Sequence, residues 1–477
     1  MSELLRMTGI SKSFGQVRAL DNAQLSLKSG EVLALMGENG AGKSTLMNIL
    51  SGAITNYTGD IFIDGKKTVI ASPTAAQKLG IAKIHQELQL VRETSVAENI
   101  FMGREKCNRF GFVRKAEMEQ EAQKYLDMLE LPIKANRKIK SLRIGEQQMV
   151  EIAKALSLNA RILIMDEPTS ALTSKEIDRL FGIIKSLKEK GVGIIYISHR
   201  LEELQDIADR VTIMRDGKFI TRGEFKDMRM DEIIKNMVGR EIKEKFPRVS
   251  MPRGKKIFSI KNLSAGKMVR DVSFDVYEGE ILGIAGLMGA GRTESTRALF
   301  GVDAKDGGTI ELDGKEIFVN CPTDAIRQGV VLAPEDRKKD GLCTKLSIKE
   351  NIALPNLDIL CNRFGIIDRK KEEAMLDNAV KRLSLKMAGG DKDAASLSGG
   401  NQQKLVVAKW LLRESRVIIF DEPTRGIDVA AKVEIYNLMN KLKQEGKGVV
   451  FVSSELPEIL GIADRIVVLC EGRVTGE

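Results

Sequence analysis

The sequence is poor in the residues that build metal centres and nucleic-acid surfaces. Its 477 residues include two histidines, one tryptophan and five scattered cysteines without a C-x-x-C pair, and aromatic residues make up only 5%. We therefore interpret the cysteines as reduced structural thiols and not as zinc ligands. The net charge of +9 comes without a long lysine and arginine run, and few aromatic side chains are available for base stacking. We expect no nucleic-acid partner.

Long apolar runs are also missing. The longest, such as residues 194–197 and 449–452, have the length of buried strands and are far too short to cross a bilayer. The N-terminus lacks the charged and then apolar plan of a signal peptide. We therefore expect a cytosolic protein that reaches a membrane only through a partner.

The chain is instead built from an internal repeat. The glycine-rich segment that starts at Gly37 recurs at Gly286, and the segment Cys-Asn-Arg-Phe-Gly recurs unchanged, each about 250 residues later. We predict a first domain over residues 1–240, a linker over 241–256 and a second domain over 257–477. A helical pattern over residues 231–238 has no counterpart after the matching strand of the second half. A truncated C-terminus and a naturally short homologue both remain open.

The first copy of the glycine-rich segment is a complete phosphate-binding loop. An apolar run over residues 31–36 predicts a strand, and residues 45–50 have the pattern of a helix. Between them, glycines let backbone N–H groups turn inward toward phosphate, and the helix N-terminus adds positive charge. Lys43 would reach the β- and γ-phosphates, and Ser44 would hold Mg²⁺. The predicted ATP-binding residues are Gly37, Glu38, Asn39, Gly40, Ala41, Gly42, Lys43, Ser44 and Thr45.

Each half also carries a pair of carboxylates at the end of an apolar strand. In the first half, Asp166 suits the Mg²⁺ shell and Glu167 is placed to activate a water molecule as general base. The second half repeats the pair as Asp421 and Glu422. Either pair could instead be a charge cluster before a helix, but the preceding phosphate loop favours the catalytic interpretation.

One further motif resembles a known family. The segment with Ser398, Gly399 and Gly400 is similar to the signature motif of ABC ATPases, and the resemblance covers essentially the whole chain. It implies an α/β fold of two tandem P-loop ABC ATPase domains. Each would combine a phosphate-loop α/β core with an antiparallel β part and a helical subdomain. The resemblance also implies that Gln86 contacts Mg²⁺ and the attacking water, and that His199 senses the γ-phosphate. Phe14 would stack on adenine.

In that family each ATP lies between the phosphate loop of one domain and the signature of the other. Applied here, this pairing separates a complete site from a degenerate one. The complete site joins the first-half residues to Ser398, Gly399 and Gly400. The degenerate site joins Gly286, Gly289, Gly291, Arg292, Thr293, Glu335, Asp421, Glu422 and Ser454 to Arg143, Ile144 and Gly145.

The substitutions in the degenerate site predict slow or absent hydrolysis. Arginine at position 292 is a planar fork that cannot reproduce a compact ammonium group. Glu335 places negative charge near phosphate, which repels it unless a cation intervenes. Ile144 adds a branched side chain where backbone must approach phosphate closely. Thr293 and Asp421 could still hold Mg²⁺. We expect one productive hydrolytic site, with Glu167, His199 and Gln86 as its catalytic residues.

Within the family, the sequence is similar to ATP-binding subunits of bacterial carbohydrate importers that carry two fused domains, and most similar to the ribose importers. Galactose, xylose and autoinducer-2 importers stay open. The resemblance implies two permease copies as partners, and through them a periplasmic or lipid-anchored sugar-binding protein. The chain would lie on the cytoplasmic face of the bacterial cell membrane. A ribosome-associated tandem ATPase is the alternative, but such proteins keep both sites and have a long, charged, helical linker.

Overall fold

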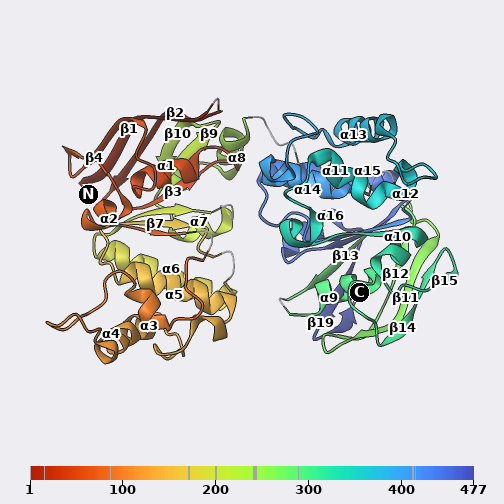
Figure 1. Ribbon diagram of the computed structural model, residues 1–477, viewed down its shortest axis with the longest axis horizontal. Coiled ribbons are helices and arrows are strands. Elements are labelled where there is room, and N and C mark those ends of the chain that lie inside the picture. Colours follow the sequence, from red (N-terminus) through yellow and green to blue (C-terminus); the bar gives the residue numbers. More distant parts are fainter. Residues whose placement is uncertain are drawn as a thin grey trace. The chain divides into compact units, whose positions relative to one another are not determined.

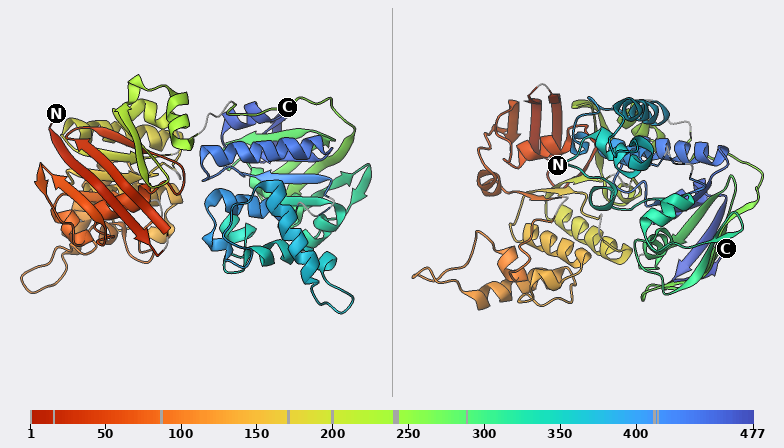
Figure 2. Two further views of the ribbon diagram at one scale, coloured as in Figure 1. Left: turned by 90° about the horizontal axis from the view of Figure 1, so that it is seen from above. Right: turned by 45° about the vertical axis from the view of Figure 1, so that its right-hand side comes forward.

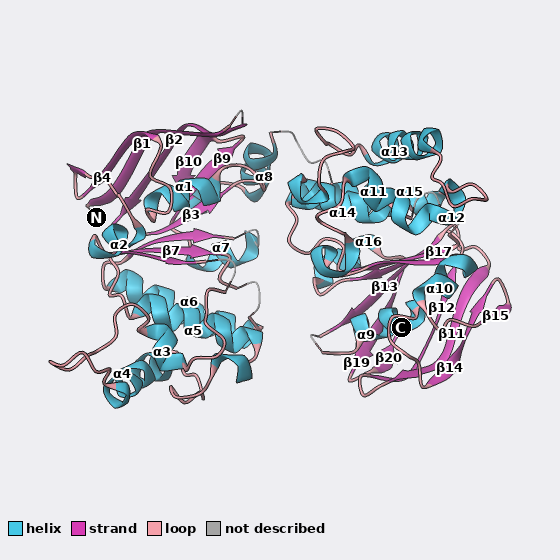
Figure 3. Ribbon diagram, viewed as in Figure 1, coloured by secondary structure: helices cyan, strands magenta, loops and turns pink. Residues whose placement is uncertain are grey.

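The chain folds into two compact units, Met1–Glu241 and Ile242–Glu477. The computed structural model describes residues 2–15, 17–85, 88–169, 172–198, 201–239, 244–287, 289–410, 413 and 415–477. Both units contain one small and one large sheet together with helices (Figures 1 and 3). They repeat the same plan, as the sequence repeat predicts.

The first unit has a four-stranded antiparallel sheet and a six-stranded sheet. The small sheet has the order β2-β1-β4-β5, with β1 Glu3–Phe14, β2 Val17–Lys28, β4 Thr58–Ile63 and β5 Lys66–Lys67. The large sheet has the order β10-β9-β3-β8-β7-β6 and is parallel apart from β10. Its strands are β3 Val32–Met36, β6 Ile81–Ile84, β7 Ile162–Asp166, β8 Gly193–Ile197, β9 Arg210–Arg215 and β10 Lys218–Glu224.

The large sheet is buried on both faces. Along β3, Val32, Ala34 and Met36 pack into one core, whereas Leu33 and Leu35 pack into another with residues of the small sheet. Such continuous apolar strands are typical of parallel sheets covered on two sides. The helices of this unit are α1 Lys43–Leu50, α2 Pro73–Lys78, α3 Val96–Ile100, α4 Lys115–Met128, α5 Ile144–Leu156, α6 Ser174–Glu189, α7 Leu201–Ile207 and α8 Met230–Val238.

The second unit repeats these sheets. Its small sheet has the order β12-β11-β14-β15, with β11 Lys256–Ala265, β12 Val269–Tyr277, β14 Gly307–Leu312 and β15 Lys315–Ile317. Its large sheet has the order β16-β17-β18-β13-β19-β20, with β13 Ile281–Gly286, β16 Val330–Ala333, β17 Val417–Asp421, β18 Gly448–Val452, β19 Arg465–Cys470 and β20 Arg473–Gly476. Its helices are α9 Arg292–Phe300, α10 Pro322–Gln328, α11 Ile348–Ala353, α12 Leu357–Leu360, α13 Arg369–Leu383, α14 Gly399–Ala408, α15 Val429–Gln444 and α16 Leu456–Ile462.

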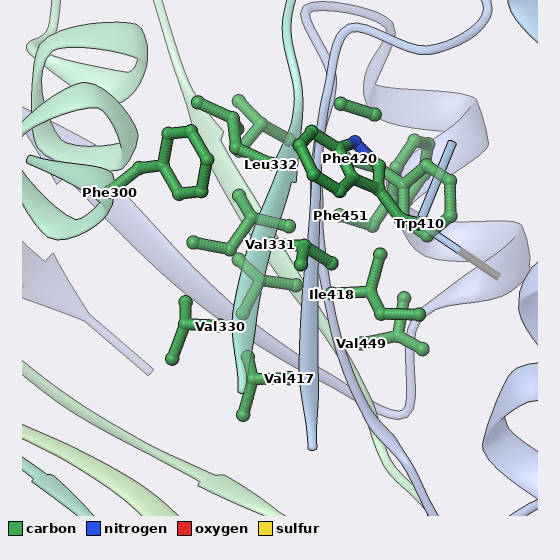
Figure 4. Packing of buried hydrophobic residues seen from close by; sticks show 14 of the residues in the cluster. Phe300, Val330, Val331, Leu332, Trp410, Val417, Ile418, Phe420, Val449 and Phe451 are labelled. Atoms are coloured by element: carbon green, nitrogen blue, oxygen red, sulfur yellow. The ribbon is translucent and has the colours of Figure 1, made fainter. Parts of the chain in front are cut away.

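Apolar side chains of β16, β17 and β18 form the centre of the second core (Figure 4). The strands are in parallel register, with Val331 opposite Ile418 and Ile418 opposite Val449. Phe300 at the end of α9 meets Trp410 edge-on, with ring centroids 6.2 Å apart. Trp410 is therefore a core residue.

The repeated sequence motifs form repeated local structures. Ser95 and Glu98 cap α3 reciprocally, and Ser347 and Glu350 cap α11 in the same way. The Cys-Asn-Arg-Phe-Gly segments form exposed loops (Figure 2). Each loop is closed by an isolated antiparallel β-bridge, between Cys107 and Val113 and between Cys361 and Ile367. Together with α4, α5, α13 and α14, these segments make up the helical parts of the two units. The predicted fold class is confirmed.

The expected helix over residues 231–238 is α8, which ends at Gly239. Two residues of the segment expected as a linker, Pro247 and Val249, are hydrogen-bonded to α15. Asn440 donates a hydrogen bond to the Pro247 carbonyl (2.7 Å), and Lys443 donates one to the Val249 carbonyl (2.6 Å). Among the helices that the structure describes, none is long and apolar enough to span a membrane.

Candidate functional site

The first phosphate loop, residues 37–45, joins β3 to α1 and has a backbone that depends on glycine. Gly37 and Gly42 have φ values of 156° and 91°. A Cβ at Gly37 would lie 2.3 Å from the Met214 carbonyl oxygen, and one at Gly42 would lie 2.8 Å from the Ala19 carbonyl oxygen. The loop therefore folds tightly against β9 and β2 only because these positions lack side chains.

Lys43 and Ser44 stand at the start of α1. The Lys43 ammonium donates hydrogen bonds to the carbonyls of Gly37 (2.7 Å) and Glu38 (3.0 Å), which hold it against the loop. Ser44 is exposed in the first turn. Both side chains therefore lie at the helix N-terminus, where partial positive charge favours an anion.

Asp166, at the end of β7, is buried beside a lysine that the sequence motifs do not include. Lys83 of β6 places its ammonium 3.8 Å from Asp166 and donates a 2.8 Å hydrogen bond to Asn48 of α1. Burial raises the pKa of Asp166, and the positive charge of Lys83 opposes that shift. Burial also lowers the pKa of Lys83, against the pull of Asp166. Lys83 is thus the nearby counter-ion of the carboxylate expected to face Mg²⁺.

The glutamates that follow the two strands share an unusual backbone. Glu167 has φ 50° and Glu422 has φ 47°, in the left-handed region that side-chain-bearing residues rarely adopt. Backbone hydrogen bonds hold both in place, from Glu167 to the Ile197 carbonyl and from Glu422 to the Val452 carbonyl. This strain is of the kind that clusters at functional sites.

Two predicted catalytic residues of the first half, Gln86 and His199, lie outside the described residues. Next to His199, the Ser198 hydroxyl donates to Glu203 (3.1 Å), and Thr169 donates to the same carboxylate (2.9 Å). This buried network ties β8 to α7 and to the segment after Glu167. Phe14 ends β1, is 50% exposed, and has the Lys12 ammonium 4.9 Å from its ring centroid.

The second phosphate loop keeps the same glycine geometry, but the arginine at its end binds groups of the protein. Gly286 and Gly291 have φ values of 158° and 92°, close to those of Gly37 and Gly42. Arg292, however, lies 3.1 Å from the Glu422 carboxylate and donates a 2.6 Å hydrogen bond to the Ser453 carbonyl. Ser454 donates a further hydrogen bond to Glu422 (3.1 Å). The glutamate that would activate water is therefore bound by the arginine that replaces the lysine.

Asp421 is compensated differently from Asp166. Thr296 and Thr293 of α9 donate hydrogen bonds to its two oxygens, at 3.0 and 3.3 Å. Burial raises the pKa of Asp421 to about 6, although these hydrogen bonds oppose the shift. Leu332 stands in β16 where Lys83 stands in β6, so the second half has hydroxyl donors in place of the ammonium group.

Glu335 forms an ion pair with Arg425, in the turn after β17. Its other oxygen accepts a 3.4 Å hydrogen bond from Thr293. The cation that Glu335 needs near phosphate is thus supplied by the protein itself.

The two signature segments differ in their exposed surfaces. Just before α14, the N-cap residue Ser398 is exposed and accepts a 2.9 Å hydrogen bond from Asn401, while Gly400 within the helix is buried. A Cβ at Gly400 would lie 2.8 Å from the Cβ of Ala431. At the start of α5, Arg143 precedes Ile144, whose side chain is 65% exposed. Gly145 follows within the same helix. Only the second half therefore presents a small, polar signature.

Comparison with known proteins decides the family. The ABC transporter family model matches residues 20–170 and 269–425. The chain belongs to the ABC transporter family. This ABC protein is 51% identical over 476 residues to the putative ribose/galactose/methyl galactoside import ATP-binding protein 1 of Agrobacterium fabrum, covering all of this chain and 94% of that protein. It is 49% identical over 473 residues to the ribose import ATP-binding protein RbsA of Bacillus subtilis, covering 99% and 96%.

A solved structure of the archaeal ribosome recycling factor aABCE1, in complex with ribosomal stalk protein aP1, matches this ABC protein with a TM-score of 0.64. The identity is 22%, and the match covers 98% of this chain and 89% of that chain. At this identity the likeness concerns the fold alone.

Several site residues are absent from the sequence prediction. Lys83, Thr296, Arg425 and Arg337 are not among the predicted site residues, although both arginines lie in segments that resemble the second half of carbohydrate importers. Each of the four contacts a partner far away in the chain. For Lys83, an ionisable residue in an otherwise apolar strand was a usable signal. For the other three, the sequence alone gives no signal of the contact.

Proposed function

We propose that this chain is the ATP-hydrolysing subunit of an importer for a monosaccharide, with ribose as its substrate. The observation that carries the proposal is the complete first-half site together with near full-length identity to ribose import ATP-binding proteins. The subunit would bind two permease copies at the cytoplasmic face of the bacterial membrane, and a sugar-binding protein would deliver the sugar to them.

In the first half, residues 37–45 would hold the phosphates of ATP, and Lys43 would turn from the loop carbonyls to the β- and γ-phosphates. Ser44, Asp166 and Gln86 would hold Mg²⁺, which neutralises phosphate charge when bound. The buried carboxylate of Asp166 fits such a site, because carboxylate oxygens are ligands that Mg²⁺ prefers. Glu167 would orient and deprotonate the attacking water, with His199 at the γ-phosphate, and Phe14 would stack on adenine. Ser398, Gly399 and Gly400 would close the site from the second half.

In the second half, we propose that the site is structural or regulatory and not hydrolytic. Arg292 is bound to Glu422, so that the glutamate lacks a free carboxylate for water activation. Glu335 is bound to Arg425. Nucleotide would bind the closed and open forms of this subunit with different affinities. The resulting shift between the two forms would move the permease.

The test is ATP turnover of the complex reconstituted with its permease and sugar-binding protein. We expect ribose-loaded binding protein to stimulate turnover, and Lys43→Ala to remove it. Binding proteins loaded with galactose, xylose or autoinducer-2 serve as the comparison. Stimulation by one of these and not by ribose would contradict the substrate, and absence of turnover in any mixture would contradict the ATPase assignment.

A further inference from the structure

Arg337 joins three segments of the second unit that surround its signature. It opens the short helix η3, Arg337–Gly341, four residues after β16 ends at Ala333. Its guanidinium donates to the carbonyls of Arg425 (3.1 Å) and Gly426 (3.5 Å) and to the side-chain oxygen of Gln402 (3.4 Å). One planar fork thus connects η3, the turn after β17 and helix α14, which is geometry that arginine provides and lysine does not.

The same guanidinium lies against the backbone of the signature. A Cβ at Gly399 would lie 2.9 Å from an Arg337 nitrogen, and a Cβ at Gly400 would lie 2.8 Å from Ala431 of α15. The first turn of α14 is therefore seated between Arg337 on one side and Ala431 on the other. If Arg337 moved, the first turn of α14 would lose its packing contact on that side.

The turn that Arg337 binds is itself held by the degenerate site. Arg425 forms an ion pair with Glu335, whose second oxygen accepts from Thr293 at the start of α9. Burial lowers the pKa of Arg337, against the influence of Asp336. The two backbone carbonyls provide the dipoles that a partly desolvated cation needs. The contacts thus run from the second phosphate loop to the signature without a nucleotide.

We propose that Arg337 is a positioning residue that holds the signature residues 398–400 in place for the ATP site of the first half. The Glu335–Arg425 ion pair in turn holds the turn that Arg337 binds. The inference rests on the proposed function, in which that signature completes the hydrolytic site. Backbone N–H groups at a helix N-terminus act on phosphate only when they point at it, and small misplacements at a reacting centre cost large factors in rate. The degenerate site then has a role in turnover although it hydrolyses nothing.

The experiment compares three variants of the complete complex. Ser398→Arg places in the second signature the residue that Arg143 provides in the first, and tests whether this signature serves the hydrolytic site. Arg337→Met removes the fork and keeps the apolar stem. Arg416→Met is the matched control, because Arg416 also joins distant segments of the same unit, through Asp313 at 2.9 Å, without touching α14. Turnover, the KM for ATP and the thermal unfolding midpoint are measured for each.

We expect Arg337→Met to raise the KM for ATP about fivefold and to lower turnover about tenfold. Its unfolding midpoint should stay near that of Arg416→Met, and Arg337→Lys, which keeps the charge and one donor group, should lose less activity. If Ser398→Arg is inactive but Arg337→Met keeps the parent KM and turnover, the positioning role is overturned and the proposed function stands. If Ser398→Arg retains full turnover, the signature pairing in the proposed function fails instead. Should Arg337→Met not fold, Arg337→Lys decides by the same KM and turnover.

Discussion

At the scale of single residues, the two halves neutralise the same buried aspartate in different ways. Asp166 has the Lys83 ammonium at 3.8 Å, whereas Asp421 receives hydrogen bonds from Thr293 and Thr296. An ammonium group and a bound cation would compete for the same carboxylate. If Mg²⁺ binds Asp166 as we propose, Lys83 stabilises the first half before the ion binds and lowers the gain in stability from Mg²⁺ binding.

We predict that Lys83→Leu destabilises the protein by about 3 kcal/mol without nucleotide, because removing one partner leaves a buried charge uncompensated. Mg²⁺ with ATP should then raise the unfolding midpoint more in the variant than in the parent protein. Thermal unfolding with and without Mg²⁺–ATP measures both effects. Lys67→Leu is the control, since Lys67 pairs with Asp60 at the surface and such pairs contribute at most about 1 kcal/mol. Equal losses in the two variants would contradict this role.

The sequence could identify site residues that are brought together by their immediate neighbours in the chain. Gly37, Lys43 and Ser44 follow one strand and open one helix, so local pattern places them together. It could not indicate that Arg292 turns to Glu422, or that Arg425 pairs with Glu335, because these contacts depend on how distant strands align in the sheet. The left-handed backbone of Glu167 is also set by the pairing with β8 and not by its own preference.

At the scale of elements, helices α15 and α16 are joined by a buried ion pair between Lys432 and Glu458. Lys432 lies 2.8 Å from Glu458, which also accepts hydrogen bonds from Thr424 and Ser453. Burial would raise the pKa of Glu458, but Lys432 outweighs it and the pKa is lowered. At the position of Lys432, the first half has Ile177 in α6. We therefore expect this ion pair to stabilise the second unit.

We predict that Lys432→Met lowers the free energy of unfolding by about 3 kcal/mol at pH 7, because Glu458 is then buried without its cation. A lowered carboxyl pKa stabilises the parent protein above the unfolded-state pKa of Glu, about 4.3, and this contribution is lost as pH falls through the folded-state pKa. In the variant the Glu458 pKa rises instead. The difference between the two proteins should thus be largest near pH 7 and shrink toward pH 4, as denaturant unfolding across this range would measure. A difference that is constant with pH would contradict the ion-pair explanation.

Elements themselves were well predicted where apolar patterns are strong. The strands β3, β8 and β18 and helix α8 match their expected segments, because continuous apolar runs and a clear helical period identify them. The linker was harder to predict. Its polar and proline-containing residues gave no sign that the carbonyls of Pro247 and Val249 bind α15.

At the scale of the whole molecule, duplication has produced two units with one plan and different chemistry. The glycine geometry of both phosphate loops is retained, so the backbone cradle does not depend on lysine at its end. What differs is the environment of the glutamate at the general-base position. Glu422 is 7% exposed and bound by Arg292, whereas Glu167 is partly exposed. We therefore expect turnover in the first half and support of the signature by the second.

The most direct test of this central claim is ATP turnover of Glu167→Gln and Glu422→Gln in the same reconstituted complex. Loss of a general base costs about a hundredfold or more, so we predict that Glu167→Gln removes turnover. Glu422→Gln should keep turnover within about twofold, since Glu422 is not the proposed general base. The glutamine oxygen can still accept from Arg292, and its NH₂ group can donate to the Ser454 hydroxyl instead of accepting from it. Equal loss of turnover in the two variants, at unchanged unfolding midpoints, would contradict the claim that Glu167 alone drives hydrolysis.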